Sequence, residues 1–226
     1  MTSKITVSNE VFDFLTELKK NNNRDWFEAN KPTFKKHQSK VKLFFEMVKE
    51  NLNHHDEIEK MKLFRIYRDV RFSKDKTPYK SHFAGSFSRL GAHLRGGYYL
   101  HLKPGESFLA TGFWAPNKED LFRIRKELEM DASEFREVIN KKELKTIWGE
   151  LSGDEVKTAP KGFDKEHPDI DLIRKKQFVF VRKLSDKEVL SPLFIDEVDK
   201  SYRAIRPYFD LMSDILTTNL NGESIL

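Results

Sequence analysis

The sequence predicts an α+β fold, an antiparallel sheet of about five strands flanked by N-terminal and C-terminal helices. Apolar residues recur at helical spacing near both ends of the chain, whereas short runs between them alternate apolar and polar residues as strands do. The connections between most of these runs are too short for a crossover, so neighbouring strands must be antiparallel. No linker rich in Gly, Pro or Ser divides the chain, and we expect a single domain over residues 1–226 with an ordered core of about 8–218.

The N-terminal part is predicted to be helical. Asn9–Lys20 carries one apolar stripe and follows Ser8, a residue type that suits an N-cap. We expect Arg24–Ala29 to form one short helical turn. A longer helix should begin near Pro32, because proline suits the first turn of a helix, and should end at about Asn53.

Alternating patterns in the middle of the chain predict four strands, over Met61–Phe72, Ser81–Leu90, Tyr98–Lys103 and Ser107–Trp114. In the first of them Arg68 falls on the apolar side of the strand. A buried guanidinium needs a carboxylate or a bound anion, because an unpaired buried charge is very costly. The partner of Arg68 should therefore distinguish a structural role of this segment from a binding site.

The C-terminal half is predicted to return to helices and to add a fifth strand, over Gln177–Lys183, which is rich in β-branched and aromatic residues. The final helix should be capped by Ser191 and kinked at Pro207. The remaining predictions are helices over Lys118–Glu129, Asp131–Asn140, Glu143–Trp148 and Pro168–Arg174, with a short strand near Glu155–Lys157 in the loop that precedes the last of these.

Composition excludes several classes of protein. The chain has no cysteine, which rules out disulfides, thiolate metal sites and thiol nucleophiles. The first ten residues hold no apolar run, so we expect neither a signal peptide nor a membrane span, and we expect a cytoplasmic protein. The chain contains no phosphate loop, dinucleotide fingerprint or nucleophile elbow, and its histidines lack metal-ligand spacing. No cofactor or metal is expected.

Positive charge is concentrated in Phe64–Phe83, which holds six basic and two acidic residues and so carries +4 of the chain's formal net charge of +5. Arginine forks match phosphate and carboxylate groups, and lysines act as mobile point charges. The segment therefore predicts a site for an anionic, phosphate-bearing ligand, either a small molecule or a nucleic-acid backbone. The candidate ligand-binding residues are Arg65, Arg68, Arg71, Lys74, Lys76, Tyr79, Lys80, Tyr99 and Trp114.

Two other interpretations remain open for the same region. Asp69 and Asp75 could pair with the neighbouring cations, in which case the segment is an ion-pair network in a structural or protein-binding domain. A hydrolase or transferase is the other alternative, with His101 or His82 as base and Asp69 orienting it. It draws on the polar face of the predicted sheet, where the expected residues are Arg65, Arg71, His82, Ser86, Ser88, Tyr99 and His101.

Several segments together resemble a known family. The resemblance is carried by NNNRDWF (21–27), FRIYRDVRFSKDKTPYKSHF (64–83), GGYYLHLKPGESFLATGFWAP (96–116), PKGFDKEHP (160–168) and LIRKKQFVFVR (172–182). They are similar to the uncharacterised family called domain of unknown function 2461, from about Phe12 to Phe209. The resemblance implies a single domain and an intracellular protein, and it brings no activity, ligand or catalytic residue with it.

Overall fold

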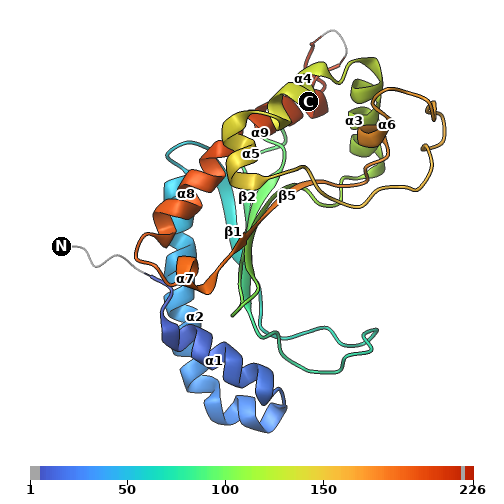
Figure 1. Ribbon diagram of the computed structural model, residues 1–226. Coiled ribbons are helices and arrows are strands. Elements are labelled where there is room, and N and C mark those ends of the chain that lie inside the picture. The colour runs from blue at the N-terminus through green and yellow to red at the C-terminus, as the bar shows by residue number, and fades with distance from the viewer. Residues whose placement is uncertain (1–5, 220–221) are drawn as a thin grey trace. The chain divides into compact units, whose positions relative to one another are not determined.

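The computed structural model describes residues 6–219 and 222–226 (Figure 1). Its strands form one antiparallel sheet in the order β1-β2-β3-β4-β5, with helices from both ends of the chain flanking it, so the predicted α+β fold is confirmed. The strands are β1 (Ile58–Leu63), β2 (Phe83–Arg89), β3 (Gly97–Leu102), β4 (Ser107–Phe113) and β5 (Phe178–Leu184).

The described residues divide into two compact units. The first unit contains residues 6–87, 99–109 and 183–200, and the second contains residues 88–98, 110–182, 201–219 and 222–226. The expectation of a single domain stays a prediction.

Helix α2 (Arg24–Leu52) covers one face of the sheet in the first unit. Its Phe34 ring lies 5.8 Å from that of Phe83, and its Phe45 ring lies 5.7 Å from that of Phe87. Between these strand residues stands Gly85, where a Cβ atom would lie 2.6 Å from the Phe45 ring. Glycine is therefore required at this position for the helix to approach the sheet. The unit also contains α1 (Asn9–Lys20), α7 (Asp186–Val189) and the start of α8 (Phe194–Ala204).

The predicted break before Pro32 is wrong, because α2 runs without interruption through the proline. Its N-terminus is capped by Asn23, whose side chain accepts a hydrogen bond from the Trp26 amide at 2.9 Å. Interior proline costs a helix about 3 kcal/mol. That cost is offset by burial of Phe27 and Phe34 on either side of the proline, with ring centroids 5.2 Å apart.

The predicted strand over Met61–Phe72 is also wrong, since β1 ends at Leu63. Residues 64–82, which we call the basic arm, leave the sheet as two limbs. The limbs are held together by the Lys80 amide donating to the Ile66 carbonyl at 2.8 Å and the Arg68 amide donating to the Pro78 carbonyl at 2.9 Å. Pro78 has no amide hydrogen to extend the ladder. The alternation of apolar and polar residues therefore continues to Phe72, although regular strand pairing of β1 stops at Leu63.

The second unit is built around Tyr208, which is fully buried and whose hydroxyl donates to the Phe178 carbonyl at 3.1 Å. Four rings lie 5.2–6.2 Å from it, those of Phe113, Phe135, Phe180 and Phe209. The helices of this unit are α3 (Lys118–Met130), α4 (Ser133–Ile139), α5 (Lys142–Trp148), α6 (Ile170–Ile173), the end of α8, and α9 (Arg206–Thr217).

The C-terminal predictions need three corrections. The single kinked helix is two helices, α8 and α9, and Pro207 lies in the first turn of α9, where its missing amide hydrogen costs nothing. Helix α7 was not predicted, although Ser185 and Glu188 form a capping box at its start. The short strand expected near Glu155 is an isolated bridge between Glu155 and Lys175.

Candidate functional site

Arg68 has a protein partner. Its guanidinium donates to the Asp75 carboxylate and the Thr77 hydroxyl, both within the basic arm. Its side chain is 25% exposed, so it is not the fully buried arginine that the strand pattern predicts. The pKa of the Asp75 carboxyl is lowered to about 2, chiefly because the Thr77 amide donates to it and then because Arg68 does. Through these contacts Arg68 holds two parts of the basic arm together.

Two more cations of the arm are bound locally. Arg71 forms a two-point contact with Asp69, at 3.0 Å from Nε and 2.7 Å from an Nη atom, which lowers the pKa of that carboxyl. Lys76 donates to the Val70 carbonyl at 3.0 Å. Lys74 is exposed, and no described residue bonds to its ammonium group. Much of the positive charge counted in the sequence therefore forms ion pairs or hydrogen bonds within the basic arm itself.

Arg65 lies in a small pocket that the sequence did not predict. The pocket has a volume of about 200 Å³ and is lined by Phe27, Lys31, Phe34, Lys35, Gln38, Arg65, Ile66 and Tyr67. We call it the Arg65 pocket. Its lining contains three cations and no carboxylate.

Lys31 and Lys35 reach this pocket from α2, about thirty residues before Arg65 in the chain. Their i, i+4 spacing places both on one face of the helix, which is the signal that sequence reasoning missed. Lys31 also pairs with Glu28 at 2.9 Å on the exposed side of the helix, and this raises the lysine pKa. Among the described residues no carboxylate bonds to Lys35 or Arg65.

Tyr79 belongs to the core. It is 4% exposed, and its ring stacks on Phe27 with centroids 3.9 Å apart. Asn22 binds its backbone on both sides, accepting from the Tyr79 amide at 3.1 Å and donating to its carbonyl at 2.9 Å. Tyr79 therefore anchors the arm beneath α2 and is not among the residues that line the Arg65 pocket.

A cluster of rings lies on the sheet in the first unit, formed by Phe64, His82, Tyr99, His101 and Phe108. The His82 and His101 centroids are 4.2 Å apart, and His101 stacks on Phe108 at 4.6 Å. Tyr99 lies 5.6 Å from Phe108 and 6.2 Å from Phe64. We call these five residues the ring cluster. The expected polar face thus brings His82, Tyr99 and His101 together, whereas Arg65 lines the pocket and Arg71 pairs with Asp69.

Burial controls the protonation of the ring cluster. It lowers the pKa of His82 to about 3, with smaller effects from His101 and Lys80, and the pKa of His101 to about 4, with a smaller effect from Lys103. Burial also raises the pKa of Tyr99, whose hydroxyl lies 3.1 Å from Nδ1 of His101. Both histidines are therefore neutral at pH 7.

The arrangement expected for a histidine base is not assembled by these side chains. The Asp69 carboxylate is held by Arg71. Among the described residues no carboxylate lies within hydrogen-bonding distance of His82 or His101. Trp114, one of the predicted ligand-binding residues, belongs to the second unit and is 67% exposed, whereas the other candidates belong to the first unit.

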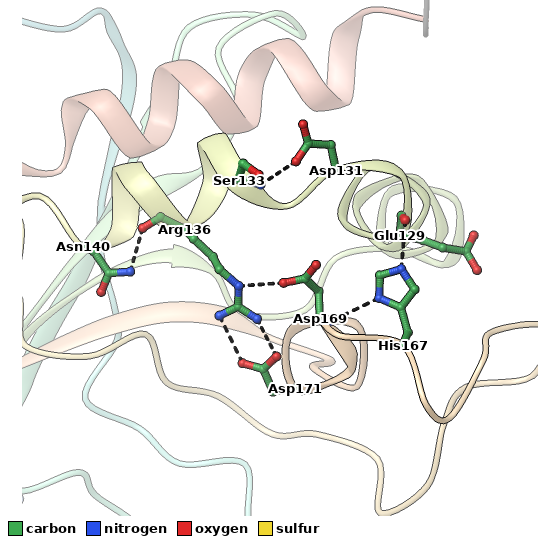
Figure 2. Close-up of polar contacts among 8 residues, drawn as sticks. All are labelled: Glu129, Asp131, Ser133, Arg136, Asn140, His167, Asp169 and Asp171. Carbon is green, nitrogen blue, oxygen red and sulfur yellow. Dashed lines mark hydrogen bonds and ion pairs between the residues drawn. The ribbon is translucent and has the colours of Figure 1, made fainter.

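The second unit contains a polar cluster of its own (Figure 2). Arg136 of α4 lies between Asp169 and Asp171, at 2.6 Å from each carboxylate. Nδ1 of His167 accepts from the Asp169 amide at 3.1 Å, so its Nε2 carries the proton and donates to the Glu129 carbonyl at 3.0 Å. These bonds tie the loop before α6 to α3 and α4, which is a structural role.

Two further properties bear on function. Within residues 6–219 and 222–226, no group of three or more His, Asp or Glu side chains is arranged to hold a metal ion. None of the helices in the same residues is both long enough and apolar enough to cross a membrane.

Comparison with known proteins assigns a family. The model of the family described as conserved hypothetical protein (DUF2461) matches residues 10–211 of the 226-residue chain. The chain belongs to this family. The DUF2461 match includes the basic arm, the Arg65 pocket and the ring cluster, and it confirms the resemblance read from the sequence. No curated protein and no solved structure matches the chain.

Proposed function

We propose that this DUF2461 protein binds a small anion, a free phosphate or the phosphate group of a larger molecule, in the Arg65 pocket. The observation that carries the proposal is the composition of the lining, with Lys31, Lys35 and Arg65 and no carboxylate. Lys31 has Glu28 as a counter-ion, but no carboxylate among the described residues bonds to Lys35 or Arg65, and these like charges repel one another. A bound anion relieves that repulsion.

The size of the pocket supports a phosphate group as its occupant. Sites for whole small molecules usually measure about 300–1,000 Å³. A volume of about 200 Å³ suits a single group of a ligand whose remainder stays outside. The guanidinium of Arg65 supplies a planar fork for two oxygens, and the lysines supply point charges. The rings of Phe27 and Phe34 line the same pocket, and Lys35 and Arg65 are exposed, so their charges can be reached from solvent.

The proposal is tested by calorimetric titration of the protein with inorganic phosphate and pyrophosphate at low salt. Arg65→Gln and Lys35→Gln should each weaken binding about tenfold or more, because a hydrogen bond to a charged group contributes about 1.5–3 kcal/mol. Lys74→Gln is the matched control, since it removes one charge from the same arm outside the pocket. Absence of binding to the wild type, or equal weakening in the control, would refute the proposal.

The ion pairs of the arm support a second candidate function, the docking of a protein partner. Arg68 with Asp75 and Arg71 with Asp69 brace the arm. At its tip Phe72 is 96% exposed, which is unusual for so large an apolar side chain. A partner that co-purifies with the wild type and is lost on Phe72→Ser, while phosphate binding is unchanged, would favour this function over anion binding.

A further inference from the structure

The ring cluster forms a row of ring side chains across the surface of the sheet, in which His101 stacks on Phe108. Phe64 follows β1, His82 precedes β2, Tyr99 and His101 belong to β3, and Phe108 belongs to β4. Neighbouring strands lie about 4.8 Å apart, so a surface that crosses four strands extends over roughly 14 Å. Every ring lies within 6.2 Å of another, and all five residues are half-buried, so part of each remains open to solvent.

Two ammonium groups lie at one end of this surface. Nζ of Lys62 is 5.6 Å from the centroid of Phe64, and Nζ of Lys80 is 5.8 Å from the same centroid. No carboxylate among the described residues bonds to either lysine. Burial lowers the pKa of Lys80, and the nearby Arg65 adds to that effect, so the cation is held where a counter-ion would stabilise it. Lys103, by contrast, is already paired with Glu106 at 2.7 Å.

The cluster combines stacking surfaces with neutral hydrogen-bonding groups. Phenyl, phenol and imidazole rings stack on nucleobases of any sequence because every base has a π-face. His82 and His101 are neutral at pH 7, and a neutral imidazole has one donor and one acceptor nitrogen. Nδ1 of His101 lies 3.1 Å from the Tyr99 hydroxyl, which leaves its Nε2 for the edge of a base. Phosphates need cations beside the stacked rings, and Lys62 and Lys80 occupy that position.

We propose that the ring cluster, with Lys62 and Lys80, is a binding surface for single-stranded nucleic acid. Bases stack on Tyr99 and on the face of Phe108 that is not covered by His101, while the backbone passes the two lysines. A single strand fits better than a mononucleotide because the surface crosses four strands of the sheet and is longer than one base. It fits better than a duplex because paired bases are stacked on one another and hide their faces. The surface shares no residue with the Arg65 pocket, so the two proposals can fail independently.

The test is fluorescence anisotropy with a short labelled oligothymidylate, with a duplex of equal length and with thymidine monophosphate as competitor. Tyr99→Leu and Phe108→Leu keep apolar volume but remove the π-face. Each should weaken single-strand binding at least about fivefold, since stacking contributes roughly 1–3 kcal/mol per base. Circular dichroism melting of each variant separates loss of the surface from loss of the fold.

The lysines have a distinct signature in the salt dependence of binding. The slope of log K against log salt is about −0.7 per phosphate neutralised on a single strand, so the double variant Lys62→Gln, Lys80→Gln should reduce the slope by roughly 1.4. Lys74→Gln should leave the affinity of the surface unchanged, and Arg65→Gln should weaken phosphate binding only. The proposal is overturned if the wild type does not bind the single strand at low salt. It is also overturned if the duplex or the mononucleotide binds as tightly, or if folded Tyr99→Leu and Phe108→Leu proteins bind like the wild type.

Discussion

Replacing Tyr79 by alanine should destabilise the first unit by about 3–4 kcal/mol and release the basic arm. The side chain is 4% exposed and stacks on Phe27 at 3.9 Å. A buried aromatic removes roughly 150–250 Å² from water, which corresponds to about 4–6 kcal/mol as an upper bound. Truncations of buried aromatics typically cost about 3–5 kcal/mol, and because the area figure is an upper bound we expect the lower part of that range.

Two matched variants separate stacking from other effects. Tyr79→Phe keeps the ring, and no described residue bonds to the Tyr79 hydroxyl, so this change should cost less than about 1 kcal/mol. Tyr67 is on the opposite limb of the arm and is 45% exposed, so Tyr67→Ala should cost less than about 2 kcal/mol.

Urea unfolding monitored by circular dichroism measures the free energy of unfolding, and hydrogen exchange in a peptide covering residues 64–83 reports on the arm itself. In Tyr79→Ala the amides of Arg68 and Lys80, which join the two limbs, should exchange faster. A cost below about 1 kcal/mol would refute the assignment of Tyr79 to the core. An equal cost for Tyr79→Phe would refute the role of stacking.

Two further predictions concern pH and backbone geometry. Between pH 6.5 and 5 the free energy of unfolding should fall with falling pH. In the unfolded chain both histidines have a pKa near 6.5 and take up protons, whereas in the folded protein His82 and His101 have pKa values of about 3 and 4 and do not. Urea titrations of His101→Gln should show a weaker pH dependence of stability, and an unchanged pH dependence would contradict the lowered pKa of His101. Gly112 has φ of 115° and its backbone lies against the Phe178 carbonyl, so Gly112→Ala should cost about 3 kcal/mol or more of stability. Gly105 has φ of 74° and open space around it, so Gly105→Ala should cost only about 1–2 kcal/mol. Similar melting temperatures for the two variants would argue against the close approach of Gly112 to Phe178.

Buried charge illustrates where sequence reasoning reaches its limit. Alternation correctly places Phe83 and Phe87 on the inner face of β2, and the same alternation places Arg89 there. Arg89 is 4% exposed and donates to the Arg95 carbonyl at 2.7 Å. Its guanidinium also lies 4.9 Å from the Phe209 centroid. Among the described residues the buried arginine is therefore Arg89 and not Arg68, and part of its environment comes from more than a hundred residues away.

The candidate site shows the same limit. Counting charges identified residues 64–83 as the basic segment, and the short spacing of Asp69 and Arg71 allowed for local pairing. It did not reveal which cations remain for a ligand. Lys35 was missed because the sequence does not show which segment packs beside its helix, whereas in the structure Lys35 and Arg65 line the same pocket.

The sequence by itself determined the α+β class, the family, the helical character of both ends of the chain and most strands, because hydrophobic periodicity is a local property of the chain. Only the tertiary structure decided that α2 continues through Pro32, that β1 stops at Leu63, and that Tyr79 is a core residue. The first and third of these depend on burial against residues distant in sequence, Phe34 against Phe83 and Tyr79 against Phe27, and such burial outweighs local preference by a few kcal/mol. The same reason explains why Lys31, Lys35 and Arg65 meet in one pocket, since folding brings together charges that the sequence separates.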